Sequence, residues 1–202
     1  MNVTHLDHKR LMTSLFIVFL TILATLLAFD VCSDDSQGEI QLYETGDAGP
    51  SVTWKYNRYS GLLSFEGKGI IYDYEIITDD PKDPLRDPPK WSRCDARAVV
   101  FGEGITEIGK SALRYNDSVT EISLPSTLVR IGQNAFSGTN IWRIELPASL
   151  RIIDTMAFSN TDLINVVIPD NVTYLGPSVF AKCLHLKTLN RLVSEIPNLF
   201  RF

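Results

Sequence analysis

The chain has 202 residues, 45% of them hydrophobic, and a formal net charge of −5 at pH 7. This length accommodates one domain and an additional segment, while the acidic balance argues against a nucleic-acid partner, which selects a basic surface. Of the 3 histidines, only His185 lies beyond the first ten residues, so neither a histidine-based catalytic triad nor a typical zinc site can be assembled. We therefore expect no enzymatic activity, metal or cofactor.

The N-terminal segment, residues 1–33, is expected to direct the chain out of the cytoplasm. Lys9 and Arg10 precede an uncharged run from Leu11 to Phe29, and acidic residues follow it. Positive charge before the run and acid after it orient the rest of the chain away from the cytoplasm. A cleaved signal peptide and an uncleaved signal-anchor both fit a run of this length. In either case the repeats would lie outside the cytoplasm, and the chain would contact a membrane only through this segment and only if the segment is uncleaved.

Residues 34–51 are polar with little periodicity, so they are expected to form a linker. Residues 52–97 are expected to hold a small β cap and then a loop rich in proline and charge. Alternating apolar residues predict three short cap strands, Val52–Tyr56, Leu62–Glu66 and Ile70–Tyr74. Such a cap would shield the first repeat from water.

Residues 98–202 carry a repeated apolar pattern with a period of 22 or 23 residues. Four columns run through the segments VVFGEGITEIGKSAL, ISLPSTLVRIGQNAF, IELPASLRIIDTMAF and VIPDNVTYLGPSVF. Their members are Phe101, Leu124, Leu146 and Ile168; Ile105, Leu128, Leu150 and Val172; Ile108, Ile131, Ile153 and Leu175; and Leu113, Phe136, Phe158 and Phe180. This period is typical of a leucine-rich solenoid, in which each coil buries its inner face against its neighbours.

Each period divides into a strand and a return segment. The LxxLxL spacing of Val119, Ile122 and Leu124 predicts a short strand with one inward face. In the return segment, Gly109, Gly132, Asp154 and Gly176 stand where a single helical turn is predicted to begin. The predicted fold is an α+β repeat solenoid, a leucine-rich-repeat array of four to five short coils, each with one short strand and a one-turn helix, behind a small N-terminal β cap.

The string L-P-x-x-L-x-x-I-G-x-x-A-F resembles the BspA-type leucine-rich repeat. The preceding segment VTWKYNRYSGLLSFEGKGIIYDY is similar to the hairpin-like region that often leads into such arrays. The resemblance implies a secreted or surface-displayed binding or adhesion protein without catalytic chemistry. Departures from the pattern are Asp154 in place of glycine, Val179 in place of alanine and Leu113 in place of phenylalanine.

Outward positions of the predicted strands would form one ribbon across the coils, with Trp142 and Arg143 at its middle. A tryptophan and an arginine beside apolar residues and flanked by polar rows have the composition of a binding hot spot. The candidate binding residues are Trp142, Arg143, Glu145, Ile164, Asn165 and Val167. The expected function is an extracellular or cell-surface scaffold that recognises a protein or glycan partner. The alternative is a membrane-anchored structural surface protein with no specific ligand.

Two glycosylation sequons, at Asn116 and Asn171, follow the N-terminal segment. Asn171 follows Pro169 in an expected exposed turn, whereas Asn116 aligns with a small inward column. We therefore expect a eukaryotic secretory host to glycosylate Asn171 in preference to Asn116. The same inward column contains Cys183, which is expected to be a buried free thiol.

The C-terminal end includes the apolar residues Leu192, Val193, Ile196, Leu199 and Phe200, and it is therefore too apolar for a solvated tail. Two arrangements of this segment are expected, and a truncated gene product would have the same composition. The segment can fold back over the last coil as an irregular cap, or the open edge can pair with another subunit and form an oligomer.

Overall fold

Short strands joined by tight turns make up the part of the chain that the computed structural model describes, residues 42–75 and 89–190. The expected N-terminal leader, most of the proline-rich loop and the apolar C-terminal end lie outside these residues. Within the described ranges, no helix has the length and apolar character needed to cross a membrane.

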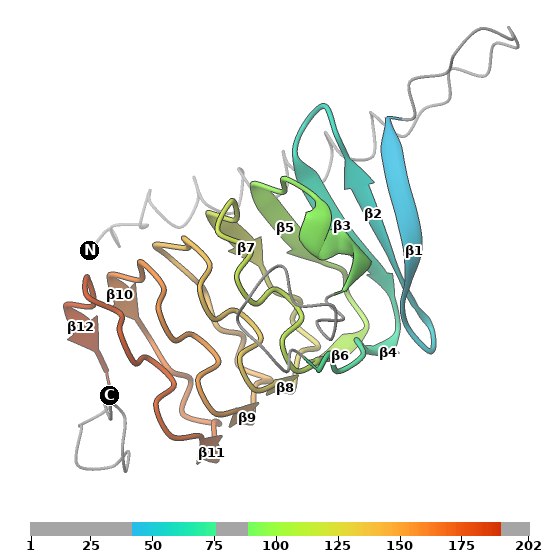
Figure 1. Cartoon of the computed structure of the whole chain (residues 1–202). Helices are drawn as coiled ribbons and strands as arrows, with labels where there is room; N and C mark the ends of the chain where they lie inside the picture. Colours follow the sequence, from blue (N-terminus) through green and yellow to red (C-terminus); the bar gives the residue numbers. More distant parts are fainter. Residues whose placement is uncertain (1–41, 76–88, 191–202) are drawn as a thin grey trace, which may run out of the picture. The chain divides into compact units, whose positions relative to one another are not determined.

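An antiparallel hairpin sheet begins the described chain and joins the solenoid without a break (Figure 1). Its strands are β1 (Tyr43–Gly49), β2 (Val52–Asn57) and β3 (Leu62–Gly67). β3 pairs in parallel with β5 (Ala98–Phe101), which pairs with β7 (Glu121–Ser123). The expectation of a linker is thus wrong for the part of residues 34–51 that forms β1, because β1 gains its backbone partners from β2, a pairing with no strong local signal.

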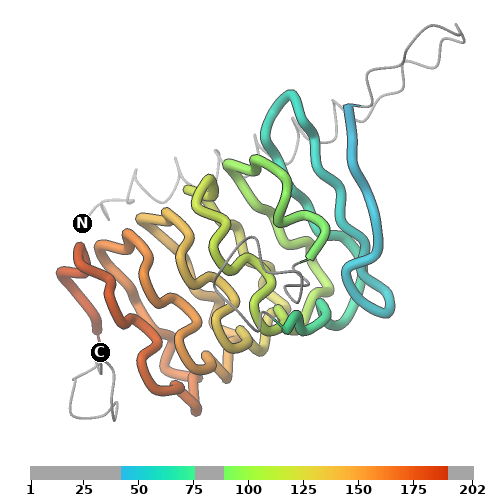
Figure 2. The backbone as a smooth tube through the Cα atoms, viewed as in Figure 1, coloured from blue at the N-terminus to red at the C-terminus, as the bar shows by residue number. Residues whose placement is uncertain are grey.

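Four coils of the described chain contribute a second short strand, which the repeat pattern does not predict. These strands form a parallel sheet in the order β11 (Tyr174–Leu175), β9 (Ile152–Ile153), β8 (Arg130–Ile131), β6 (Ile105–Ile108) and β4 (Gly69–Ile70). The predicted third cap strand is therefore reduced to β4, and it pairs with β6 rather than with the hairpin. Figure 2 shows the successive coils stacked side by side.

The predicted one-turn helices are wrong: the return segments are tight turns, and among the described residues the only helix is the 3-10 helix η1 (Lys90–Arg93), before the first coil. The return segments of successive coils contain left-handed residues at matching positions, Ser111, Asn134, Met156 and Ser178, with φ between 55° and 58°. A left-handed residue interrupts a right-handed helix. Instead, the turns bond to the next coil, as the amide of Phe136 does to the carbonyl of Ala157 at 2.9 Å.

The core is a stack of aromatic rings along the solenoid. Phe136 and Phe158 stack with ring centroids 5.3 Å apart, and Phe158 and Phe180 at 5.7 Å, as the inward column predicts. The hairpin continues this stack, because Phe65 of β3 stacks on Phe101 of β5 at 4.9 Å. The cap therefore covers the first coil with aromatic surface.

Candidate binding surface

The first strands of successive coils lie side by side with matched register. Ala98 of β5 stands opposite Glu121 of β7, an isolated bridge joins Arg143 to Asn165, and β10 (Asn165–Val166) pairs with β12 (Thr188–Leu189). Outward side chains of these strands therefore form rows across the coils. We call this surface the strand face. Its outward positions are Arg97, Ala98 and Val100; Thr120, Glu121 and Ser123; Trp142, Arg143 and Glu145; Ile164, Asn165 and Val167; and Lys187, Thr188 and Asn190.

The six candidate binding residues lie on two neighbouring coils of the strand face. Trp142 is 53% exposed and Val167 is 69% exposed. Arg143, Glu145 and Asn165 are also exposed, and Ile164 is half-buried. The structure thus brings all six to one surface, with its two exposed apolar side chains separated by polar ones; their role in binding remains a proposal.

Polar side chains around Trp142 are held in pairs. The guanidinium of Arg143 contacts the Glu145 carboxylate, and the Thr188 hydroxyl donates to the Asn165 side-chain oxygen at 2.5 Å. Farther along, the Asn190 amide group makes two bonds to the Ile168 backbone, accepting at 2.8 Å and donating at 2.9 Å. Paired side chains lose less rotamer freedom when a ligand binds, so this surface is preorganised.

The backbone ladder of the strand face is interrupted beside Trp142. At the other coil junctions, an amide bonds to the preceding strand, as Thr120 does to Arg97 at 3.0 Å and Ile164 does to Trp142 at 3.1 Å. Over the described residues, no backbone hydrogen bond joins the Trp142 amide to the Thr120 carbonyl, and the five-stranded sheet ends at β7. The same two coils are hydrogen-bonded to each other elsewhere. The Arg151 amide bonds to the Val129 carbonyl, and the Asn134 amide bonds to the Thr155 carbonyl.

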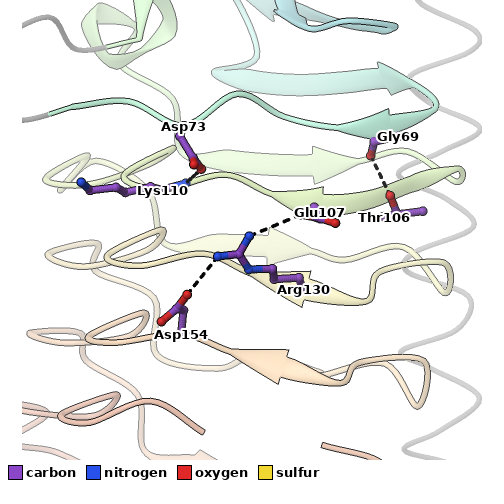
Figure 3. Close-up of polar contacts among 7 residues, drawn as sticks. All are labelled: Gly69, Asp73, Thr106, Glu107, Lys110, Arg130 and Asp154. Atoms are coloured by element: carbon purple, nitrogen blue, oxygen red, sulfur yellow. Dashed lines mark hydrogen bonds and ion pairs between the residues drawn. The ribbon is translucent and has the colours of Figure 1, made fainter. Parts of the chain in front are cut away.

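The sheet of β4, β6, β8, β9 and β11 presents a second, differently composed surface, which we call the second-sheet face. Its outward residues include Thr106, Glu107, Val129, Arg130, Arg151, Ile152, Thr173 and Tyr174. Arg130 lies between Asp154, at 3.0 Å, and Glu107, at 3.5 Å (Figure 3). The hydrogen bond that Arg130 donates to the Asp154 carboxylate is the main reason that the pKa of Arg130 is raised. On this face charges are paired across coils, and Tyr174 is 48% exposed.

A family model for the BspA-type leucine-rich repeat region matches residues 90–199, more than half of the chain, as six copies. The chain belongs to the BspA-type leucine-rich-repeat family. The comparison with curated proteins finds no match.

Solved leucine-rich-repeat proteins share the fold of this BspA-type chain. One from Eubacterium ventriosum has a TM-score of 0.58 at 19% identity, over 75% of this chain and 44% of that protein. Another from Bacteroides ovatus has a TM-score of 0.50 at 22% identity, over 70% of this chain and 40% of that protein. The BspA-type chain therefore spans less than half the length of either protein, and the likeness concerns the fold alone.

The two sequons of the BspA-type chain differ in exposure, as the repeat columns predict. Asn116 is 5% exposed, in the column that also contains the buried Thr139 and Thr161. Asn171 is exposed, and its side-chain amide donates to the Ala148 carbonyl at 3.0 Å. Glycosylation of Asn171 in preference to Asn116 stays a prediction for a eukaryotic host.

The two cysteines among the described residues, Cys94 and Cys183, are free and buried. Burial raises the pKa of the Cys94 thiol to about 11, and the Glu44 carboxylate adds to the increase. Burial also raises the pKa of Cys183, against hydrogen bonding from Thr161, whose hydroxyl lies 3.2 Å from the sulfur. Both thiols are thus held in the unreactive protonated form. Over the described ranges, no cluster of three or more metal-ligating side chains is present.

Proposed function

We propose that the chain is an extracellular or cell-surface binding scaffold that recognises a protein or glycan partner through the strand face. The observation that supports this most is Trp142, which is 53% exposed at the middle of its row, with the exposed Thr120 and the half-buried Ile164 on its two sides and the exposed Arg143 next to it along the chain. Large aromatic side chains normally lie buried, and tryptophan is enriched among the residues that dominate binding energy. Membership of a repeat family built as a scaffold supports the same function.

The expected export signal at the N-terminus supports a surface location. The uncharged run from Leu11 to Phe29, preceded by basic residues, orients the following chain away from the cytoplasm. The same run, if uncleaved, favours the second candidate function, a membrane-anchored structural surface protein without a specific ligand. Binding through Trp142 distinguishes these two functions.

The roles within the proposed site follow from side-chain chemistry. Trp142 supplies a rigid apolar contact at low entropic cost, because it has only two side-chain torsions. Arg143, Glu145 and Asn165 set specificity through directed hydrogen bonds. Ile164 and Val167 add apolar contact at the edges of the patch.

The experiment is a cell-binding or pull-down assay with the exported chain, comparing wild type with Trp142→Ala and Arg143→Glu. Because truncating a hot-spot tryptophan costs about 2 kcal/mol or more, Trp142→Ala should weaken binding at least about 30-fold. Arg143→Glu should also weaken it, by placing like charges beside Glu145. Tyr174→Ala is the matched control, since Tyr174 has similar exposure on the second-sheet face.

Circular dichroism must show that each variant is folded. Wild-type binding by both Trp142→Ala and Arg143→Glu would place the binding site elsewhere, or support the structural function. A loss of binding in Tyr174→Ala alone would move the site to the second-sheet face.

A further inference from the structure

The charge on the strand face does not select an ionic ligand. Arg97, Arg143 and Lys187 carry positive charge, and Glu121 and Glu145 carry negative charge, so the two signs nearly cancel. Arg143 and Glu145 also neutralise each other directly. Such a surface offers hydrogen bonds without a strong field, which favours a neutral polar ligand over a polyanion.

The distribution of apolar atoms also distinguishes between ligands. A protein interface concentrates apolar side chains in a central, fully desolvated core. Here Trp142 lies beside the half-buried Ile164, Val167 lies in a different outward row, and the row of Arg143 and Asn165 lies between them. A single exposed indole among planar polar groups matches a sugar ring, whose C–H face stacks on the negative face of an aromatic ring while its hydroxyls meet hydrogen-bonding side chains.

The interrupted ladder provides further hydrogen-bonding groups at the same place. Within the described part of the chain, the Trp142 amide and the Thr120 carbonyl do not bond to each other, although the equivalent groups do at the other coil junctions. The bonded sides of these two coils keep them one strand apart, so a peptide strand cannot insert between them. A hydroxyl group can both donate and accept, so one hydroxyl can satisfy both backbone groups.

We infer that the partner of the strand face is a neutral glycan that stacks a sugar ring on Trp142, an inference that rests on the proposed function. Arg143, Glu145 and Asn165 bond to its hydroxyls. One further hydroxyl bonds to the Trp142 amide and the Thr120 carbonyl at the open junction. Since the contact is mainly uncharged, raising the ionic strength from about 0.05 to 0.5 M should change the affinity less than about threefold.

The test compares binding of the full chain to mock-treated cells and to cells treated with periodate, which cleaves the vicinal diols of sugars. Periodate should reduce binding at least about 10-fold. On an array of neutral oligosaccharides, Trp142→Ala should lose the signal of the wild type, and Trp142→Phe, which keeps an aromatic face, should retain most of it. Tyr174→Ala should bind like the wild type.

The outcomes separate the two proposals. If Trp142→Ala weakens binding to mock-treated cells while periodate leaves wild-type binding unchanged, the partner is a protein; the glycan inference is then wrong and the proposed function stands. If Trp142→Ala binds mock-treated cells as the wild type does, the strand-face function itself is wrong. A loss of affinity at high salt greater than about 10-fold would show an ionic ligand and contradict a neutral glycan.

Discussion

Asp154 accepts a hydrogen bond of 3.0 Å from Arg130 of the preceding coil. It occupies the position that glycine holds in the other coils. Its other carboxylate oxygen accepts from the Thr155 amide at 2.7 Å. The departure from the repeat pattern therefore has a structural role, because it adds an ion pair that joins two coils on the second-sheet face.

Asp154→Ala should lower the free energy of unfolding by about 1 kcal/mol, since the pair is partly exposed and exposed ion pairs contribute little. Denaturant unfolding of Asp154→Ala, Arg130→Ala and the double variant should give a coupling energy of about 0.5 kcal/mol that decreases at high salt. Strictly additive single effects would show that the pair does not stabilise the fold.

Gly176 lies too close to the preceding coil for a side chain. A Cβ atom added there would be 2.4 Å from the Thr155 amide nitrogen and 2.7 Å from the Asp154 carbonyl carbon. Because backbone atoms cannot move away cheaply, Gly176→Ala should lower the free energy of unfolding by about 3 kcal/mol. Asp154→Ala is the matched control at the equivalent position, which already carries a Cβ; equal effects in the two variants would contradict this explanation.

Phe158 has an aromatic neighbour on each side and is fully buried. Phe158→Ala should cost about 3 to 5 kcal/mol, the usual range for truncating a buried phenylalanine. Since coils have little stability apart from their neighbours, most of the domain should unfold together. Denaturant unfolding that shows a change below about 1 kcal/mol would mean that the ring is not inward. Tyr174→Ala, on the surface, should change the stability by less than about 0.5 kcal/mol.

The buried thiols should resist alkylation in the folded protein. Because the pKa of Cys94 is about 11, only about one thousandth of it is thiolate at pH 8. The third cysteine of the sequence, Cys32, is replaced by serine so that it does not react. In this Cys32→Ser variant, mass spectrometry after iodoacetamide treatment should find Cys94 and Cys183 unmodified in the folded protein and modified in urea. Rapid native labelling of either thiol would contradict its burial.

The raised pKa of Cys94 also gives stability a pH dependence. The folded protein holds the thiol proton up to about pH 11, whereas the unfolded chain releases it near the ordinary value of 9.0. The unfolded state thus binds fewer protons over this window, so stability should fall as the pH rises from about 9 to 11. A Cys94→Ser variant should lose this part of the decline, as measured by denaturant unfolding at each pH.

Sequence periodicity predicted the core correctly, because inward columns depend only on the spacing of apolar residues. Phe136, Phe158 and Phe180 are fully buried, and the small polar column at Asn116 is buried too. The outward placement of Trp142 followed from the same frame. These features are local consequences of one repeated coil.

Features that depend on contacts between coils could not be predicted. Asn134 and Met156 adopt a left-handed backbone that few non-glycine residues favour, and their amides bond to neighbouring coils at 3.0 and 3.1 Å. The return segments are therefore tight, non-helical turns and not the one-turn helices that the N-cap pattern predicts. Strand β1 was missed for the same reason, since its polar sequence pairs with β2 through the backbone.

The sequence likewise does not predict the open junction beside Trp142. Thr120 and Trp142 occupy ordinary positions of the repeat, and nothing in their residue types indicates an interrupted ladder. The sequence shows Asp154 only as a departure from the glycine pattern and does not indicate its ion pair, since its partner Arg130 lies in another coil. The residues of a single repeat determine the fold of its coil, whereas these contacts depend also on residues of the neighbouring repeats.

The most direct measurement of the central claim is hydroxyl-radical footprinting of the full chain, free and bound to the cells that capture it. Trp142 and Tyr174 are exposed to a similar extent on the two sheet faces, so they report on the faces equally well. Binding through the strand face predicts that oxidation of Trp142 falls at least about fivefold on binding while that of Tyr174 stays unchanged. Protection of Tyr174 with undiminished oxidation of Trp142 would contradict it.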